Sequence, residues 1–165
     1  MSRRKRVLKR PVILADKNFG SILVSKLINR VMWDGKKTIA SRIVTTALME
    51  AAKEVEVTEV ELLDAVLDQV TPKVEVQSMR VGGANYQVPM EPRPERALRL
   101  ALTWIVDAAR KMKGKPMNLK LKQIMVESFN GQGPAVAKKN AVHQTAAGNR
   151  AFTHLAYRAK KKASA

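Results

Sequence analysis

The sequence predicts a mainly α-helical single domain of six helices with one protruding two-stranded β-hairpin arm. Apolar residues recur with the helical period of about 3.6 residues in six segments, and the period changes to about two over residues 73–91. A chain of 165 residues is long enough for one well-buried domain and short for two. We therefore expect a basic extension over residues 1–10, a domain over residues 11–155 that includes the arm, and a basic tail over residues 156–165.

Three helices are expected before the arm. The first begins at Ser21 and ends at Asp34-Gly35, and the second follows Lys36-Lys37. The third begins at Thr58, where the pattern Thr-x-x-Glu predicts a capping box, and it ends at Thr71-Pro72. The apolar residues of the first two helices that we expect to face the core are Ile22, Leu23, Leu27, Ile28, Val31, Ile39, Ala40, Ile43, Val44, Ala47, Leu48 and Ala51.

The predicted arm consists of two strands around Gly82-Gly83, a pair that favours a two-residue hairpin turn. Pairing about this turn gives the arm a mainly apolar face and puts Arg80 on the opposite face. The residues of the apolar face are Met79, Val81, Ala84, Tyr86, Val88 and Met90. Because an isolated hairpin is only marginally stable in water, we expect its base to pack on helices and its apolar, partly cationic tip to be left for a partner. The alternative is a hairpin that lies flat on the domain.

Three further helices are expected after the arm. The fourth opens at Pro94-Glu95, has Trp104 on its core stripe and is capped by Gly114. The fifth ends at Asn130-Gly131, and the sixth opens at Pro134. The apolar residues expected in the core from the fourth and fifth helices are Ala97, Leu98, Ala101, Trp104, Ile105, Ala108, Met112, Leu121, Ile124, Met125 and Phe129.

The net charge of +17 indicates a polyanionic partner, and its distribution supports that reading. Residues 1–53 carry 13 Lys or Arg against 3 Asp or Glu, residues 108–165 carry 13 against 1, and residues 54–107 carry 5 against 10. We favour nucleic acid over an anionic membrane surface, because the basic stretches lack the Trp- and Phe-bearing amphipathic face that membrane docking uses. No apolar run approaches the roughly 18–20 residues of a membrane span.

No pattern in the sequence indicates catalysis. The carboxylates Glu59, Asp64 and Asp68 are interpreted as a solvated helix face, because no His or Lys partner is nearby. His143 and His154 have no zinc-helix spacing and there is no cysteine, so we expect hydrogen-bonding or packing histidines. We expect no enzyme activity, cofactor, metal or small-molecule substrate. With few aromatics for base stacking, recognition of RNA is expected mainly through phosphates and RNA shape.

The most specific segment is VEVQSMRVGGANYQVPMEPRPERALRLALTWIVDAARKM, at residues 74–112. It resembles the hairpin and following helix of the universal small-subunit ribosomal protein S-seven family, of bacterial or organellar type. DGKKTIA at residues 34–40, MNLKLKQ at 117–123 and GPAVAKKN at 133–140 follow the same family order. The resemblance implies a helical domain with a β-arm that binds the 3′ domain of small-subunit rRNA and nucleates head assembly. It also implies a position near exit-site tRNA and beside the S-nine, S-eleven and S-nineteen proteins.

Carried over by position, the resemblance gives two groups of candidate residues. The candidates for rRNA binding are Arg3, Arg4, Lys5, Arg6, Lys9, Arg10, Lys36, Lys37, Arg80, Arg110, Lys111, Lys113, Lys115, Met117, Lys138 and Lys139. The candidates for an arm that faces tRNA or mRNA are Arg80, Val81, Gly82, Gly83, Asn85 and Tyr86. Two other functions stay open: a nucleic-acid-binding or RNA-annealing protein without a fixed site, and an RNA-modifying enzyme. We expect a cytoplasmic ribosome, with an organellar ribosome as the alternative.

Overall fold

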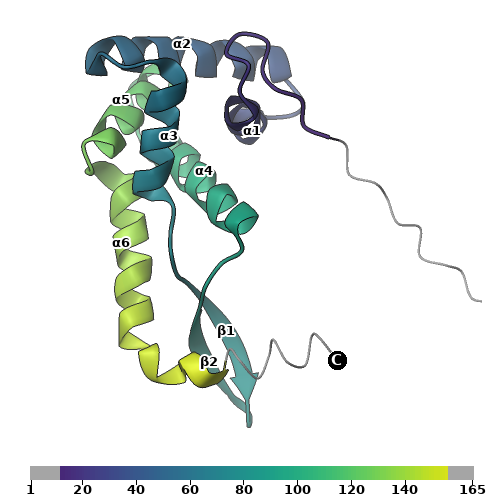
Figure 1. Ribbon diagram of the computed structural model, residues 1–165, viewed down its shortest axis with the longest axis vertical. Coiled ribbons are helices and arrows are strands. Elements are labelled where there is room, and N and C mark those ends of the chain that lie inside the picture. The colour runs from purple at the N-terminus through teal and green to yellow at the C-terminus, as the bar shows by residue number, and fades with distance from the viewer. Residues whose placement is uncertain (1–11, 156–165) are drawn as a thin grey trace, which may run out of the picture.

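The structure is a computed structural model that describes residues 12–155. Within this range it contains six α-helices, one short 3₁₀ helix and one antiparallel hairpin, which confirms the predicted mainly α fold with a β-arm. The elements are α1 (Ile22–Val31), α2 (Lys37–Val55), α3 (Glu59–Val70), β1 (Glu75–Val81), β2 (Ala84–Met90), α4 (Pro94–Lys111), α5 (Met117–Phe129), α6 (Gly133–Gly148) and η1 (Arg150–Phe152). Helices α1 to α5 form a body, from which α6 and the hairpin extend side by side (Figure 1).

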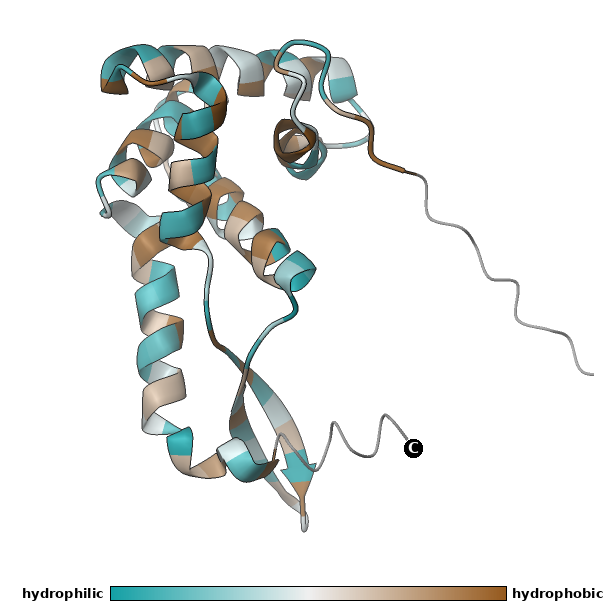
Figure 2. Cartoon of the chain, in the orientation of Figure 1, coloured by the Kyte–Doolittle hydropathy of each residue, from teal (hydrophilic) through white to brown (hydrophobic). Residues whose placement is uncertain are grey.

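The core of the body is aliphatic and centred on α5, which packs against α2, α3, α4 and α6. Hydrophobic and hydrophilic residues alternate along the helices (Figure 2), and the buried apolar side chains form one core cluster. Leu48, Leu63, Ile105 and Leu121 are almost wholly removed from solvent. Burial of a side chain of this size stabilises the fold by about 1.5–3 kcal/mol. The low aromatic content therefore does not prevent a well-packed body.

The predicted helix starts are confirmed by their capping bonds. The Ser21 hydroxyl accepts a hydrogen bond from the Leu23 amide at 3.2 Å, which begins α1. At α3, the Thr58 hydroxyl accepts from the Glu61 amide while the Glu61 carboxylate accepts from the Thr58 amide, each at 3.4 Å. These side chains satisfy amide groups that have no partner inside the helix.

The exact core faces of α1 and α2 differ from the sequence prediction. Ile22 and Ile39 were expected in the core, but their side chains are 51% and 54% exposed. The buried stripe of α1 instead contains Val24, which is fully buried. Residues two apart on a helix point to nearly opposite sides, so burial of Val24 turns Ile22 outward. In α2 the buried stripe begins at Ala40.

Two helices end earlier than expected. Helix α1 ends at Val31 rather than at Asp34-Gly35, and α4 ends at Lys111 rather than at Gly114. The two ends meet, because the Arg110 guanidinium donates to the carbonyls of Arg30 and Val31 at 3.5 and 3.4 Å. A cation near the last carbonyls of a helix satisfies free acceptors and interacts favourably with the helix dipole. A contact between distant helices thus fixes the end of α1.

The hairpin has the predicted register and turn. Met79 pairs with Tyr86, Arg80 with Asn85 and Val81 with Ala84. Gly82 and Gly83 have φ angles of 58° and 91°, in the left-handed region that this tight turn requires.

Most of the apolar face of the arm is covered, whereas the tip, which was expected to be left for a partner, is exposed at Arg80 and Val81. Val88 is fully buried and Leu155 is 8% exposed, and both belong to a small apolar cluster with Met79, Tyr86 and Phe152. The chain turns at the end of α6 and brings η1 and Leu155 onto β2 (Figure 1). This C-terminal clasp, residues 150–155, covers most of the face, and only the end at Val81 stays exposed. Leu155 and Val88 are 67 positions apart in the sequence, so strand periodicity alone carried no sign of this contact.

Candidate nucleic-acid interface

A hollow of about 400 Å³ lies between α1 and α4, and its lining combines three cations with apolar side chains. Lys26 and Arg30 extend from α1 and Arg99 from α4, against one carboxylate, Glu95. We name this site the α1–α4 hollow. Both helices are anchored in the core through their opposite faces, so their cations are held in a fixed relation. Such an arrangement suits a folded polyanion, because fixed cations can contact phosphates at defined positions.

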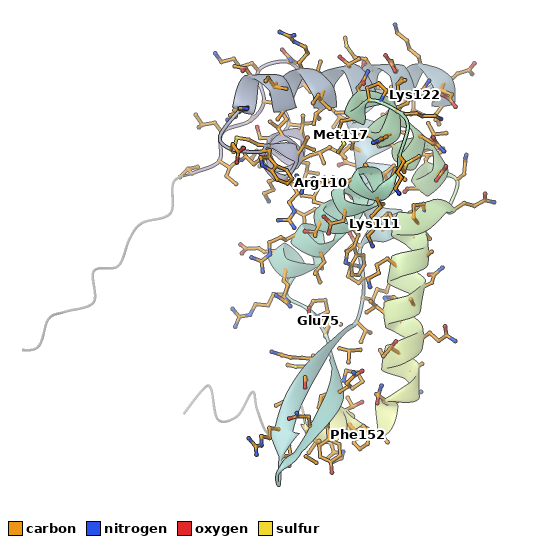
Figure 3. The ribbon with its side chains drawn as sticks, turned by 180° about the vertical axis from the view of Figure 1, so that it is seen from behind. Glu75, Arg110, Lys111, Met117, Lys122 and Phe152 are labelled. Carbon is orange, nitrogen blue, oxygen red and sulfur yellow. The ribbon has the colours of Figure 1, made fainter. Side chains whose placement is uncertain are left out.

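A second group of cations lies where the end of α1 meets the end of α4. The Arg110 guanidinium carbon lies 5.1 Å from the centroid of the Trp33 ring, a cation–π distance. The predicted residues Lys36 and Lys37 follow Trp33 after a turn, in which the Lys36 amide donates to the Trp33 carbonyl at 3.0 Å. We name residues 33–37 with Arg110 the Trp33 corner. The orientation of Arg110 can be followed in Figure 3.

A second, smaller hollow lies between α4, α6 and β1. Its volume is about 280 Å³, and its lining includes Trp104, Lys138 and Arg96. Arg96 forms a salt bridge with Glu75 at 2.6 Å, which ties the base of the arm to α4. Trp104 packs against the core, in agreement with its predicted place on the core stripe of the fourth helix, and it is partly buried. The predicted residue Lys138 is exposed at the rim.

Two side chains of α6 bind backbone groups near the end of α3. The ammonium of Lys139, a predicted rRNA contact, donates to the Gln69 carbonyl. His143 Nε2 accepts from the Lys73 amide at 3.1 Å, so the expectation of a hydrogen-bonding histidine is confirmed. The pKa of His143 is lowered, first by burial and then by the nearby charges of Lys139 and Lys73. The neutral ring that this favours is the form that can accept a hydrogen bond.

The arm carries one cation close to its turn. Arg80, Gly82, Gly83 and Asn85 are exposed, and Val81 is 37% exposed. We name residues 80–85 the arm tip. The remaining predicted arm residue, Tyr86, is partly buried against Phe152 and is therefore less accessible than expected.

The predicted cations Lys111, Lys113 and Lys115 lie at the end of α4 and in the connection from α4 to α5. Lys111, Lys113 and Lys115 are exposed, and Lys115 donates to Gln123 Oε1 at 3.1 Å. Met117 is the first residue of α5 and packs against the core rather than standing in a loop. Figure 3 shows Lys111 and Met117 with Lys122, whose ammonium pairs with Glu54 at 2.8 Å. The hydrogen bond to Glu54 raises the pKa of Lys122.

The predicted candidates of the described residues are spread over the start of α2, the arm, the α4–α5 connection and α6. The α1–α4 hollow contains three cations that sequence reasoning missed, namely Lys26, Arg30 and Arg99. Their spacing offered a signal, because Lys26 and Arg30 are four residues apart and so share one helix face. The six candidates of the basic extension lie outside the described residues: Arg3, Arg4, Lys5, Arg6, Lys9 and Arg10.

Two searches of residues 12–155 bear on other kinds of site. No helix in this part of the chain is both long and apolar enough to cross a membrane. Nor do three His, Asp or Glu side chains gather there in a group that could hold a metal ion.

Comparisons with known proteins agree with this picture of a basic helical body with an arm. The family described as "Ribosomal protein S7p/S5e" matches residues 2–150. A protein of Thermosipho africanus named "Small ribosomal subunit protein uS7" is 49% identical over 153 residues, which is 93% of this chain and 97% of the relative. The proteins of the same name from Eikenella corrodens and Thermotoga maritima are 46% and 47% identical and are covered over 100% and 97% of their lengths.

The fold and the basic surfaces, together with these relatives, define a non-enzymatic RNA-binding structural protein of a ribonucleoprotein. The chain belongs to the ribosomal protein S7 family, and it is a structural protein of the small ribosomal subunit that associates with rRNA in translation.

Proposed function

We propose that the chain binds the 3′ major domain of small-subunit rRNA and nucleates assembly of the subunit head. The α1–α4 hollow carries this proposal, because it gathers Lys26, Arg30 and Arg99 from two rigid helices on one concave surface. Cations placed in this way can bind a particular fold of RNA, whereas flexible cations bind any polyanion. The Trp33 corner adds Lys36, Lys37 and Arg110 to the candidate RNA contacts, and the basic extension adds six Lys or Arg residues in the sequence.

The arm tip supports the second part of the proposal, a position beside exit-site tRNA. The clasp holds the arm while leaving Arg80 and the Gly82-Gly83 turn accessible. A supported hairpin can place one cation and a narrow turn against a second RNA at a distance from the body. The neighbours that we propose are the S-nine, S-eleven and S-nineteen proteins. The relatives compared are bacterial proteins, which favours a cytoplasmic bacterial-type ribosome over an organellar one.

A charge-removal experiment tests the rRNA site. The variant Lys26→Gln, Arg30→Gln, Arg99→Gln removes the cations of the α1–α4 hollow. Its matched control, Lys53→Gln, Lys120→Gln, Lys122→Gln, removes three cations from the last turn of α2 and the first half of α5, none of which lines the α1–α4 hollow. We expect weaker binding of the 3′ domain transcript and a salt slope that is lower by about one for each lost phosphate contact. An equal loss of affinity for the 3′ domain transcript in both variants contradicts a localised binding site.

Deletion of residues 1–10 tests the basic extension. It removes six Lys or Arg residues and should weaken RNA binding and flatten its salt dependence, with little change in melting temperature. Competition with unrelated duplex RNA separates the proposal from the alternative of nucleic-acid binding or RNA annealing without a fixed site. A preference for the 3′ domain transcript supports the proposal, and equal competition supports the alternative.

A further inference from the structure

Trp33 differs from the other aromatic residues of the described chain in its exposure. Its side chain is 65% exposed, whereas the remaining Trp, Tyr and Phe residues between positions 12 and 155 are partly buried. Single exposed apolar side chains are common on protein surfaces and need no function. The surroundings of this ring distinguish it from such a case.

The ring is held in place from one side. The Arg110 guanidinium lies 5.1 Å from the ring centroid and donates to the backbone carbonyls of Arg30 and Val31. The guanidinium is thus held at the end of α1 and packs against one face of the indole ring. With 65% of the side chain exposed, the opposite face of the ring is open to solvent.

The backbone of Trp33 is also held. Its carbonyl accepts a hydrogen bond from the Lys36 amide at 3.0 Å, which closes a turn through Asp34 and Gly35. Both turn residues have positive φ angles, 49° and 74°. A two-residue turn closed by this bond leaves the segment little freedom. A ligand that meets the ring therefore meets a largely preorganised surface, which lowers the entropy cost of binding.

The charges around the ring select the kind of ligand. Lys36 and Lys37 follow Trp33 directly, Arg110 lies against it, and Asp34 is the one carboxylate between residues 17 and 49. An apolar protein surface gains little from a ring surrounded by cations. An unpaired nucleotide fits both features, because its base offers a planar face for stacking and its phosphates carry negative charge.

We propose that the open face of Trp33 stacks on an unpaired base of bound RNA, with Lys36 and Lys37 at the flanking phosphates. The proposal deepens the proposed rRNA-binding function and rests on it. It adds a base contact at the Trp33 corner to recognition that the sequence had indicated to be mainly through phosphates. The RNA at this corner must then be single-stranded, a loop, a bulge or the end of a helix, since a base inside a duplex is covered on both faces by its stacked neighbours.

The test uses the full chain carrying Trp104→Phe, so that Trp33 is the remaining tryptophan. Its fluorescence is followed during titration with the 3′ domain transcript. We expect quenching on binding and a roughly 5- to 150-fold loss of affinity in Trp33→Ala, with most of the affinity retained in Trp33→Phe. The matched control is Ile39→Ala, which removes another exposed apolar side chain near the start of α2 and should bind as the parent does.

The outcomes separate this inference from the function on which it rests. Unchanged fluorescence and unchanged affinity of Trp33→Ala, in a protein that still binds the transcript, overturn base stacking and leave the proposed function standing. Failure of the parent protein to bind the transcript overturns the proposed function itself. Trp33→Ala could also bind RNA normally while the assembled particles lose a neighbouring ribosomal protein. That result assigns the ring to a protein contact and also overturns stacking. If Trp33→Ala folds poorly, the affinity of Trp33→Phe for the transcript still tests the proposal, because this variant keeps an aromatic ring at the position.

Discussion

The rings of Tyr86 on β2 and Phe152 in η1 lie with their centroids 5.0 Å apart and their planes inclined by 49°. This tilted aromatic pair joins the arm to the C-terminal clasp, in which Phe152 is labelled in Figure 3. Val88 and Leu155 lie in the same apolar cluster. A two-stranded hairpin alone is marginally stable, and the clasp supplies the packing that it lacks. The position of the arm therefore depends on residues more than 60 positions away in the sequence.

Phe152→Ala is expected to loosen the arm without unfolding the body. Truncation of a partly buried aromatic side chain should destabilise the clasped state relative to the unclasped state by about 1–3 kcal/mol, less than the cost in a full core. Hydrogen exchange at the β2 amides should accelerate, whereas amides of α5 should keep their protection. The control Val81→Ala changes an exposed residue of the same hairpin. Equal protection of β2 in Phe152→Ala and the parent contradicts the clasp.

Arg80→Ala with Asn85→Ala tests the arm tip, because these two residues pair across the hairpin and both are exposed. Their removal leaves the clasp intact, so the stability should change by no more than about 0.5 kcal/mol. We expect normal entry into small subunits, measured by sedimentation, but altered frame maintenance in a reporter. The control pair Ser78→Ala with Gln87→Ala lies on the same face nearer the base. Failure to incorporate identifies the tip as a primary rRNA anchor, and normal frame maintenance removes the case for a tRNA-facing arm.

The two tryptophans should differ in iodide quenching. Trp33 is 65% exposed, whereas Trp104 is partly buried between the core and the hollow beside α6. Trp33→Phe, which leaves Trp104, should therefore be quenched less than Trp104→Phe. We expect Trp104→Ala to lower the free energy of unfolding by about 2–4 kcal/mol, near the lower part of the range for buried aromatics. Equal quenching constants are incompatible with these placements.

The lowered pKa of His143 gives stability a defined pH dependence. Burial and the charges of Lys139 and Lys73 favour the neutral ring in the folded state, so the unfolded chain binds a proton at higher pH than the folded chain. The contribution of His143 is therefore complete above its unfolded pKa of about 6.5 and is lost as the pH falls through the lower folded pKa. His143→Gln should flatten the decline in melting temperature below about pH 6.5. His154→Gln is the control, and an equal decline in all three proteins contradicts this assignment.

Much of the fold was predictable because its signals are local. The capping box of Thr58 with Glu61 and the Gly82-Gly83 turn depend on residues that are neighbours in sequence. The same holds for the order of the helices. The core faces were less certain, and Ile22 and Ile39 were placed wrongly because a helix with apolar residues on several sides does not specify which side a neighbour will cover.

The candidate site was only partly predictable. Lys36, Lys37 and Arg110 were identified as basic residues, but their meeting at the Trp33 corner follows from the packing of α1 against α4. Lys26, Arg30 and Arg99 were not selected as site residues from the sequence, because Lys and Arg are common on the exposed faces of helices. They become a site once two helices place them around one hollow.

The sequence by itself determined the helices, the hairpin register and the excess of positive charge at both ends of the chain, since these follow from local backbone preferences and composition. The tertiary structure decided three further features: which cations share a surface, that Arg110 closes the end of α1 beneath Trp33, and that the clasp covers the arm. The physical reason is that these contacts join residues tens of positions apart. Their formation depends on how whole helices pack, and a pattern read over one or two turns of a helix does not contain that information.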